Sequence, residues 1–221
     1  MHTIYASYIG YITQAIVNNF VPLLFLTFQK QYDIGLGAIG LLVTINFCVQ
    51  LTVDFLSIFF LDKLGYKKGA VLAHLICAVG LASLAFLPDA MGAPFTGLLI
   101  SVITYSIGTG LLEVLVSPIT ESCPTDNKEK AMSLLHSFYC WGHVGVVLLS
   151  TLFFALFGIE NWKIVACVWA VIPIFNIFMF SKVPIVSLIA EGEESISLRK
   201  LFSMKLFWVF MLMMVCSGAS E

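Results

Sequence analysis

Long apolar segments alternate with short polar segments along the whole chain. Each of the first six apolar segments reaches about the 20 residues that an α-helix needs to cross about 30 Å of hydrocarbon. A seventh apolar segment begins near residue 204 and continues to Glu221. The six complete segments cover approximately residues 4–27, 36–61, 68–88, 95–119, 131–157 and 163–181. The pattern therefore predicts an all-α membrane protein with six transmembrane helices and the start of a seventh.

The composition agrees with this pattern. The chain is 60% hydrophobic and 11% charged, with a mean hydropathy of +1.00, whereas an average soluble domain is about 25% charged. A soluble core does not have room for this much apolar surface, so lipid must be the solvent. The first apolar segment is not a secretory signal, because no Lys or Arg precedes Lys30. We expect a multi-pass protein of the cell membrane that has no enzymatic activity and no nucleic-acid partner.

The distribution of Lys and Arg predicts the orientation of the chain, because cytoplasmic loops carry an excess of these residues. Of the 11 basic residues, only Lys30 and Lys163 lie on one side of the predicted membrane. The remaining residues lie on the other side: Lys63, Lys67, Lys68, Lys128, Lys130, Lys182, Arg199, Lys200 and Lys205. We expect that second side, and the N-terminus with it, to be cytoplasmic.

The six cysteines do not form a disulfide framework. Most lie within predicted spans, and Cys123 lies in a loop on the predicted cytoplasmic side, where a disulfide does not persist. No group of His and Cys has the spacing of a zinc site. We therefore expect no metal and no other cofactor.

The chain divides into three predicted parts. Residues 1–181 form a six-helix transmembrane bundle, residues 182–205 a cytoplasmic connector, and residues 206–221 the start of a truncated seventh transmembrane helix. The connector is acidic and then basic and amphipathic, which favours a helix lying at the membrane interface. Many transporters consist of two six-span halves, so this layout predicts an N-terminal half that lacks its C-terminal six-helix partner. We expect residues 1–221 alone not to transport a solute.

One carboxylate lies inside a predicted span. Glu113 stands in the stretch GTGLLEVLVSPITE, residues 108–121, where a charged acid costs roughly 2.5–3.5 kcal/mol. The acid is either a neutral group in a cavity that loads and releases a proton, or a structural group that is hydrogen-bonded to a neighbouring helix. We favour proton binding, because an ionisable residue inside the membrane is a functional candidate by default.

The second span carries Asn46, Gln50 and Asp54. Their i, i+4, i+8 spacing places them on one helical face. This polar stripe either lines a cavity that binds the solute or holds another helix. Asp54 also has a simpler interpretation, because it is near enough to the end of the span to pair with Lys63 or Lys67.

The first and fifth spans carry further polar groups. In the first span, Gln14 and Asn18 lie one turn apart with Asn19 beside them. Their amides suit a hydroxyl-rich ligand, and contact between helices is the alternative. In the fifth span, one helical face carries His136, Tyr139 and His143 at i, i+3, i+7. Trp141 lies beside that face.

Each of these fifth-span residues has two interpretations. His136 lies at a depth similar to that of Glu113, so that the two are expected to share a proton. The alternative for both histidines is a hydrogen bond to a backbone carbonyl, which we favour for His143. Tyr139 and Trp141 are candidates to contact the solute, and packing is the alternative for Trp141.

The loop after the second span resembles a signature of the major facilitator superfamily. It reads LDKLGYKKG, residues 61–69, and the family has Asp-Lys/Arg-x-Gly-Arg/Lys-Lys/Arg at this place. The leading Gly of the pattern is absent, since Ile58 stands there. The resemblance implies a loop that takes part in the conformational change, with the matching residues Asp62, Lys63, Gly65, Lys67 and Lys68.

Three spans resemble the fucose permease family of sugar–proton symporters. GTGLLEVLVSP is similar to that family's G-x-G-x-x-E-x-x-x-N-P, with Ser117 in place of Asn. LLHSFYCWG, residues 134–142, is similar to L-x-Q-x-F-N-x-x-G. In the first span, the Asn18–Asn19 pair matches, but Pro22 stands where the family has an Asp. The resemblance therefore implies proton coupling through the single carboxyl of Glu113.

Together these observations predict the N-terminal half of a major-facilitator fold. We expect it to carry a sugar or a similar small polar solute together with protons, across a lipid bilayer, by alternating access. Two alternatives remain: an inactive fragment or accessory membrane protein, and a sensor that binds a solute without moving it.

Overall fold

The structure, a computed structural model, describes residues 2–185 and 198–218, and within these ranges it does not describe the side chains of Asp62, Leu198, Arg199 and Ser217. The chain forms two compact units, Met1–Val186 and Ser187–Glu221. Half of the predicted connector, residues 186–197 with its acidic stretch, lies outside the described residues.

The helices of the first unit follow the apolar segments of the sequence. The elements in this unit are α1 (His2–Leu23), α2 (Phe25–Tyr32), α3 (Leu36–Leu64), α4 (Tyr66–Ala90), α5 (Pro94–Ser122), α6 (Lys128–Phe157), the short 3-10 helix η1 (Ile159–Asn161) and α7 (Trp162–Lys182). The second unit contains α8 (Leu198–Ser203) and α9 (Lys205–Gly218). The prediction of an all-α membrane protein is confirmed.

Five of these helices are long and apolar enough to cross a membrane in the described part of the chain. The sixth predicted span is α1 together with α2, which are bent by 48° relative to each other. Pro22 lies in the last turn of α1, two residues before the break at Leu24. Proline has no backbone N–H to donate and its ring crowds the preceding turn, which accounts for the bend. The shorter apolar stretch Lys205–Cys216 is where the sequence predicts a further span.

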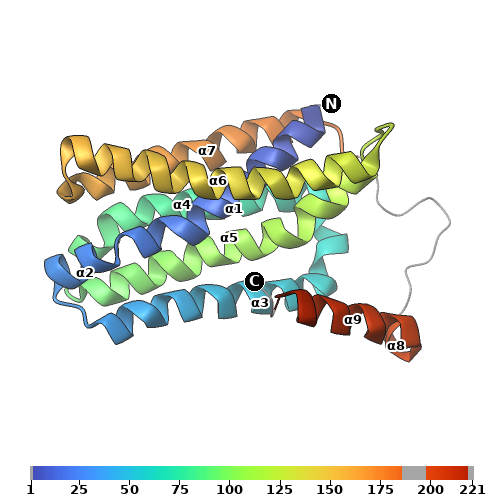
Figure 1. Cartoon of the computed structure of the whole chain (residues 1–221), viewed down its shortest axis with the longest axis horizontal. Coiled ribbons are helices and arrows are strands. Elements are labelled where there is room, and N and C mark those ends of the chain that lie inside the picture. Colours follow the sequence, from blue (N-terminus) through green and yellow to red (C-terminus); the bar gives the residue numbers. More distant parts are fainter. Residues whose placement is uncertain (1, 186–197, 219–221) are drawn as a thin grey trace. The chain divides into compact units, whose positions relative to one another are not determined.

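The first unit is organised around α5 and α1. Helix α5 contacts α4, α3, α1 and α6, and α1 contacts α6, α5 and α7. Figure 1 shows these helices lying side by side, with α1 between α5 and α6. In the apolar stretch of α5, 61% of the residues are buried, whereas the share is 22% for α3 and 17% for α6. Helices α3 and α6 therefore flank the bundle and expose most of their surface.

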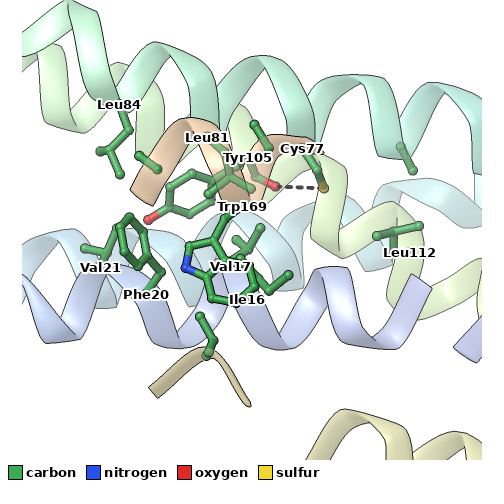
Figure 2. Packing of buried hydrophobic residues seen from close by; sticks show 14 of the residues in the cluster. Ile16, Val17, Phe20, Val21, Cys77, Leu81, Leu84, Tyr105, Leu112 and Trp169 are labelled. Atoms are coloured by element: carbon green, nitrogen blue, oxygen red, sulfur yellow. Dashed lines mark hydrogen bonds between the residues drawn. The ribbon is translucent and has the colours of Figure 1, made fainter. Parts of the chain in front are cut away.

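Large rings fill the centre of the first unit. Tyr105 of α5 and Trp169 of α7 are buried among side chains of α1 and α4, as Figure 2 shows. The indole N–H of Trp169 donates to Ser150 Oγ on α6 over 2.9 Å. In a bilayer, packing of this kind and hydrogen bonds hold helices together, because lipid is as apolar as the side chains.

A buried polar group also joins three helices of the first unit. The Asn176 side-chain N–H of α7 donates to Ala6 O on α1 over 2.9 Å and to His74 Nε2 on α4 over 2.7 Å. Because Nε2 accepts, Nδ1 is the protonated nitrogen of His74, and it donates to Ala70 O over 2.7 Å. His74 is thus a neutral structural histidine.

Candidate solute and proton site

A row of polar side chains follows one face of α1. Tyr11, Gln14 and Asn18 stand at i, i+3, i+7, which places them above one another on the helix. Gln14 contacts α5, Tyr11 contacts both α5 and α6, and Asn18 contacts α3. This face of α1 therefore contacts predicted site residues of α3, α5 and α6.

Glu113 lies beside the middle of this row. The Gln14 side-chain N–H donates to Glu113 Oε2 over 3.3 Å. The Glu113 side chain is otherwise exposed at the surface of the unit and forms no ion pair with any described residue. The sequence predicts a buried acid, and the structure places this acid on the outer surface of the first unit. Among the described residues, its hydrogen-bond partner is one neutral amide.

Tyr11 stands between Glu113 and His136. The Tyr11 hydroxyl is hydrogen-bonded to Ser117 Oγ over 2.8 Å, one turn from Glu113 on α5. On α6, the Tyr11 ring lies 5.6 Å from the ring of His136 and 6.3 Å from that of Tyr139. No hydrogen bond or ion pair joins Glu113 directly to His136 among the described residues. Tyr11 therefore lies beside His136 on one side and is bonded one turn from Glu113 on the other.

The amides predicted on the first two spans form a single cluster. The Asn46 and Gln50 side-chain N–H groups both donate to Asn18 Oδ1, over 3.2 and 3.0 Å. Gln50 also donates to Asn46 Oδ1 over 2.9 Å, and Ser106 of α5 donates to the same oxygen over 2.6 Å. Asn46 and Gln50 are buried, whereas Asn18 is partly exposed. Both bonds to Asn18 use its oxygen, so its NH₂ group stays available to a ligand.

Asp54 continues the face of Asn46 and Gln50, as the spacing predicts. Its Oδ1 atom is buried and has no hydrogen-bond partner. No ion pair joins Asp54 to Lys63 or Lys67 in the described part of the chain. The simpler interpretation, pairing with a lysine at the end of the span, therefore receives no support from the structure.

The remaining candidates lie at the edge of this site. Asn19 donates to Ala15 O of its own helix over 2.8 Å. Tyr139 is partly buried against Tyr11, whereas Trp141 is 71% exposed. His143 is also exposed. Trp141 is thus free to meet a ligand, lipid or another protein surface.

The 61–69 loop is a tight turn between α3 and α4. Gly65 alone separates the two helices and has a φ of 82°, a conformation that favours glycine. Its N–H donates to Leu61 O over 2.9 Å and ends α3. Lys63, Lys67 and Lys68 are exposed, and the Asp62 side chain lies outside the described residues.

Sequence reasoning did not single out Tyr11 or Ser106. Tyr11 lies three residues before Gln14, and Ser106 lies seven residues before Glu113, so each shares a helical face with a predicted site residue. This spacing is the sequence feature that could have identified Tyr11 and Ser106 as site residues. The described residues hold no group of three or more His, Cys, Asp or Glu side chains placed to bind a metal ion.

Comparisons with known proteins agree with this architecture. The family model of the Major Facilitator Superfamily matches residues 7–220. No curated protein matches the sequence. Among solved structures, the chain is similar to the xylose transporter XylE from E. coli in an inward open conformation, with a TM-score of 0.72 and 12% sequence identity. The similarity covers 82% of this chain and 48% of that one, so the chain spans about half the length of the transporter it matches.

Proposed function

The chain belongs to the Major Facilitator Superfamily, and on this basis we propose that it is the N-terminal half of a proton-coupled symporter for a sugar or a similar small polar solute. Its resemblance to the fucose permease family in three spans supports this class of solute. So does the similarity of its fold to that of a xylose transporter.

The observation that carries the proposal is the Glu113–Gln14 pair. Glu113 is an exposed acid in a transmembrane helix, and its hydrogen bond is to a neutral amide of a second transmembrane helix. Such an acid is tolerated where it faces a water-filled cavity or another protein surface. In a two-half transporter, that place is the central cavity near the bilayer midplane. Glu113 is then positioned to take up and release a proton.

The solute is bound beside this acid. Gln14 and Asn18 supply amide groups on the same face of α1. Asn46 and Gln50 of α3 fix the orientation of Asn18 through their hydrogen bonds to its Oδ1 atom. Amides offer both donors and acceptors, which match the hydroxyl groups of a sugar. Asn19, Tyr139 and Trp141 complete the proposed site, and an aromatic ring there would stack on the apolar face of a sugar. His136 takes part in proton coupling through Tyr11.

Alternating access would need a second six-helix half and the 61–69 loop. The halves of this fold are parallel repeats that rock about a fixed site. We propose that the second half covers the exposed polar face of α1 and α5. The loop residues Asp62, Lys63, Gly65, Lys67 and Lys68 lie where α3 turns into α4 and would change position as the halves rock.

The experiment that tests this function measures solute accumulation. The complete transporter, meaning this chain with a second six-helix half, is reconstituted in proteoliposomes and offered a panel of labelled sugars. We expect at least one sugar to accumulate when the outside is acidic, and accumulation to collapse when a protonophore is added. Uptake that does not depend on the pH gradient contradicts the proposal and favours a uniporter. Binding without any uptake also contradicts it and favours a sensor.

The Lys and Arg distribution makes a separate prediction about topology. In a cysteine-free background, we expect an impermeant thiol reagent added outside cells to label Met91→Cys and Asn161→Cys but not Lys128→Cys. The first two lie in the turns after α4 and before α7, and Lys128 begins α6 at the other end of the bundle. Labelling of Lys128→Cys alone would contradict the proposal and indicate that the N-terminus lies outside.

A further inference from the structure

Helices α3 and α5 run in the same direction and are held in register by two contacts. Ser106 of α5 donates to Asn46 of α3 over 2.6 Å. One turn further along, Gly110 of α5 lies so close to α3 that an added Cβ would be 3.0 Å from Gln50 O and 2.9 Å from Val53 Cβ. The next residues along both helices are therefore at the same level.

This register brings two acids together. Asp54 lies eight residues beyond Asn46, and Glu113 lies seven residues beyond Ser106. At 1.5 Å per residue these separations are about 12 and about 10.5 Å along parallel helices. The spacings i+8 and i+7 also keep each acid on the face that carries the Ser106–Asn46 hydrogen bond. The two carboxyl groups therefore lie at a similar level on neighbouring helices.

The two acids differ in their exposure to solvent and in their hydrogen bonds. Glu113 is exposed and accepts a hydrogen bond from Gln14. Asp54 is partly buried, and its Oδ1 atom is shielded from solvent without a hydrogen-bond partner. A buried carboxylate oxygen without a donor is costly, and a bound proton reduces that cost. Two neighbouring carboxylates do not both ionise readily, because like charges repel.

We propose that Asp54 and Glu113 form one proton-binding site, in which a single proton is held by the pair and Glu113 is the member that meets the cavity. The inference rests on the proposed function and extends it from one acid to two. The span-one position where the fucose permease family has its acid is Pro22, eight residues from Gln14 and about 12 Å further along α1. Asp54 supplies a second acid from α3 instead.

Other titratable groups lie near these helices without pairing with either acid. Tyr11 of α1 is bonded to Ser117, and His136 of α6 contacts the Tyr11 ring. His74 of α4 is buried and bonded to Ala70 and Asn176. The lysines of the 61–69 loop are exposed and form no ion pair with Asp54 or Glu113 within the described residues.

The test is infrared spectroscopy of the 221-residue chain in lipid, with the C=O band of protonated carboxyl groups followed against pH. We expect the wild-type band to contain two steps that are absent from the Asp54→Asn/Glu113→Gln double variant. In Glu113→Gln, the remaining step of Asp54 should move to lower pH by about one unit or more, because the negative charge of Glu113 no longer opposes the ionisation of Asp54. Asp126→Asn removes an exposed acid in a loop and should leave both steps in place.

The choice of Glu113→Gln protects the test against loss of folding, because it changes an exposed side chain. Asp54→Asn identifies the step of Asp54 by its loss. If the step of Asp54 keeps its wild-type position in Glu113→Gln, the acids titrate independently and the proposal is overturned. The measurement contains no solute, so its outcome is separate from that of the transport experiment.

Discussion

Glu113→Gln will abolish the accumulation of solute against its gradient and leave the exchange of solute intact. Glutamine has the shape and the neutrality of a protonated glutamate, so the variant resembles a carrier that is permanently loaded with a proton. A one-unit pH gradient supplies about 1.4 kcal/mol per proton, which supports about tenfold accumulation. In Glu113→Gln, we expect the internal concentration to stop at the external one.

The measurement compares two assays of the complete transporter in proteoliposomes. The first is uptake driven by a pH gradient, and the second is exchange of labelled for unlabelled solute at equal pH. Glu121→Gln is the matched control, because Glu121 is an exposed acid two turns further along α5. The control should behave as wild type in both assays. If Glu113→Gln still accumulates solute in response to pH, then Glu113 is structural.

The spans and the polar faces were predictable because they depend on local sequence. Hydropathy located each transmembrane helix, although α5 ends three residues after its predicted segment and α6 begins three residues before its own. Those extra turns carry polar and charged residues, so hydropathy does not extend the predicted segments over them. The spacing of Asn46 and Gln50 predicted a shared face, and the two amides are hydrogen-bonded to each other.

The neighbours of each helix were not predictable in the same way. The fourth and fifth spans are adjacent in sequence, which suggested a direct contact between Glu113 and His136. In the structure α1 contacts both α5 and α6, and the Tyr11 ring lies against His136. Periodicity tells which residues of a helix share a face, but it does not tell which other helix that face meets.

The glycines of the GTG stretch show the same limit. In the sequence they only support a resemblance to a family. In the structure they bring α5 close to a different helix on each side: Gly108 packs against Ala73 and Cys77 of α4, and Gly110 packs against α3. Small residues allow backbones in membranes to approach each other. The position of Glu113 between α1 and α3 depends on both of these contacts.

We therefore expect Gly108→Ala to destabilise the protein. An added Cβ would lie 2.6 Å from Cys77 Sγ, 2.7 Å from Ala73 O and 2.8 Å from Cys77 N. The last two are backbone atoms of α4, and they cannot move away unless α4 separates from α5. Overpacking of this kind typically costs 1–3 kcal/mol, roughly, and this exceeds the gain of about 1 kcal/mol from replacing a helical glycine with alanine. The net result should be a lower midpoint of thermal unfolding in detergent.

Gly145→Ala is the matched control for this prediction. Gly145 lies within α6, and an added Cβ would meet nothing within 4 Å. The same substitution there should raise the thermal midpoint slightly, because only the helix propensity changes. Opposite shifts for the two variants identify close packing of α4 and α5 as the cause. If Gly108→Ala unfolds at or above the wild-type temperature, the two helices have room to separate, and the GTG stretch does not fix the position of Glu113.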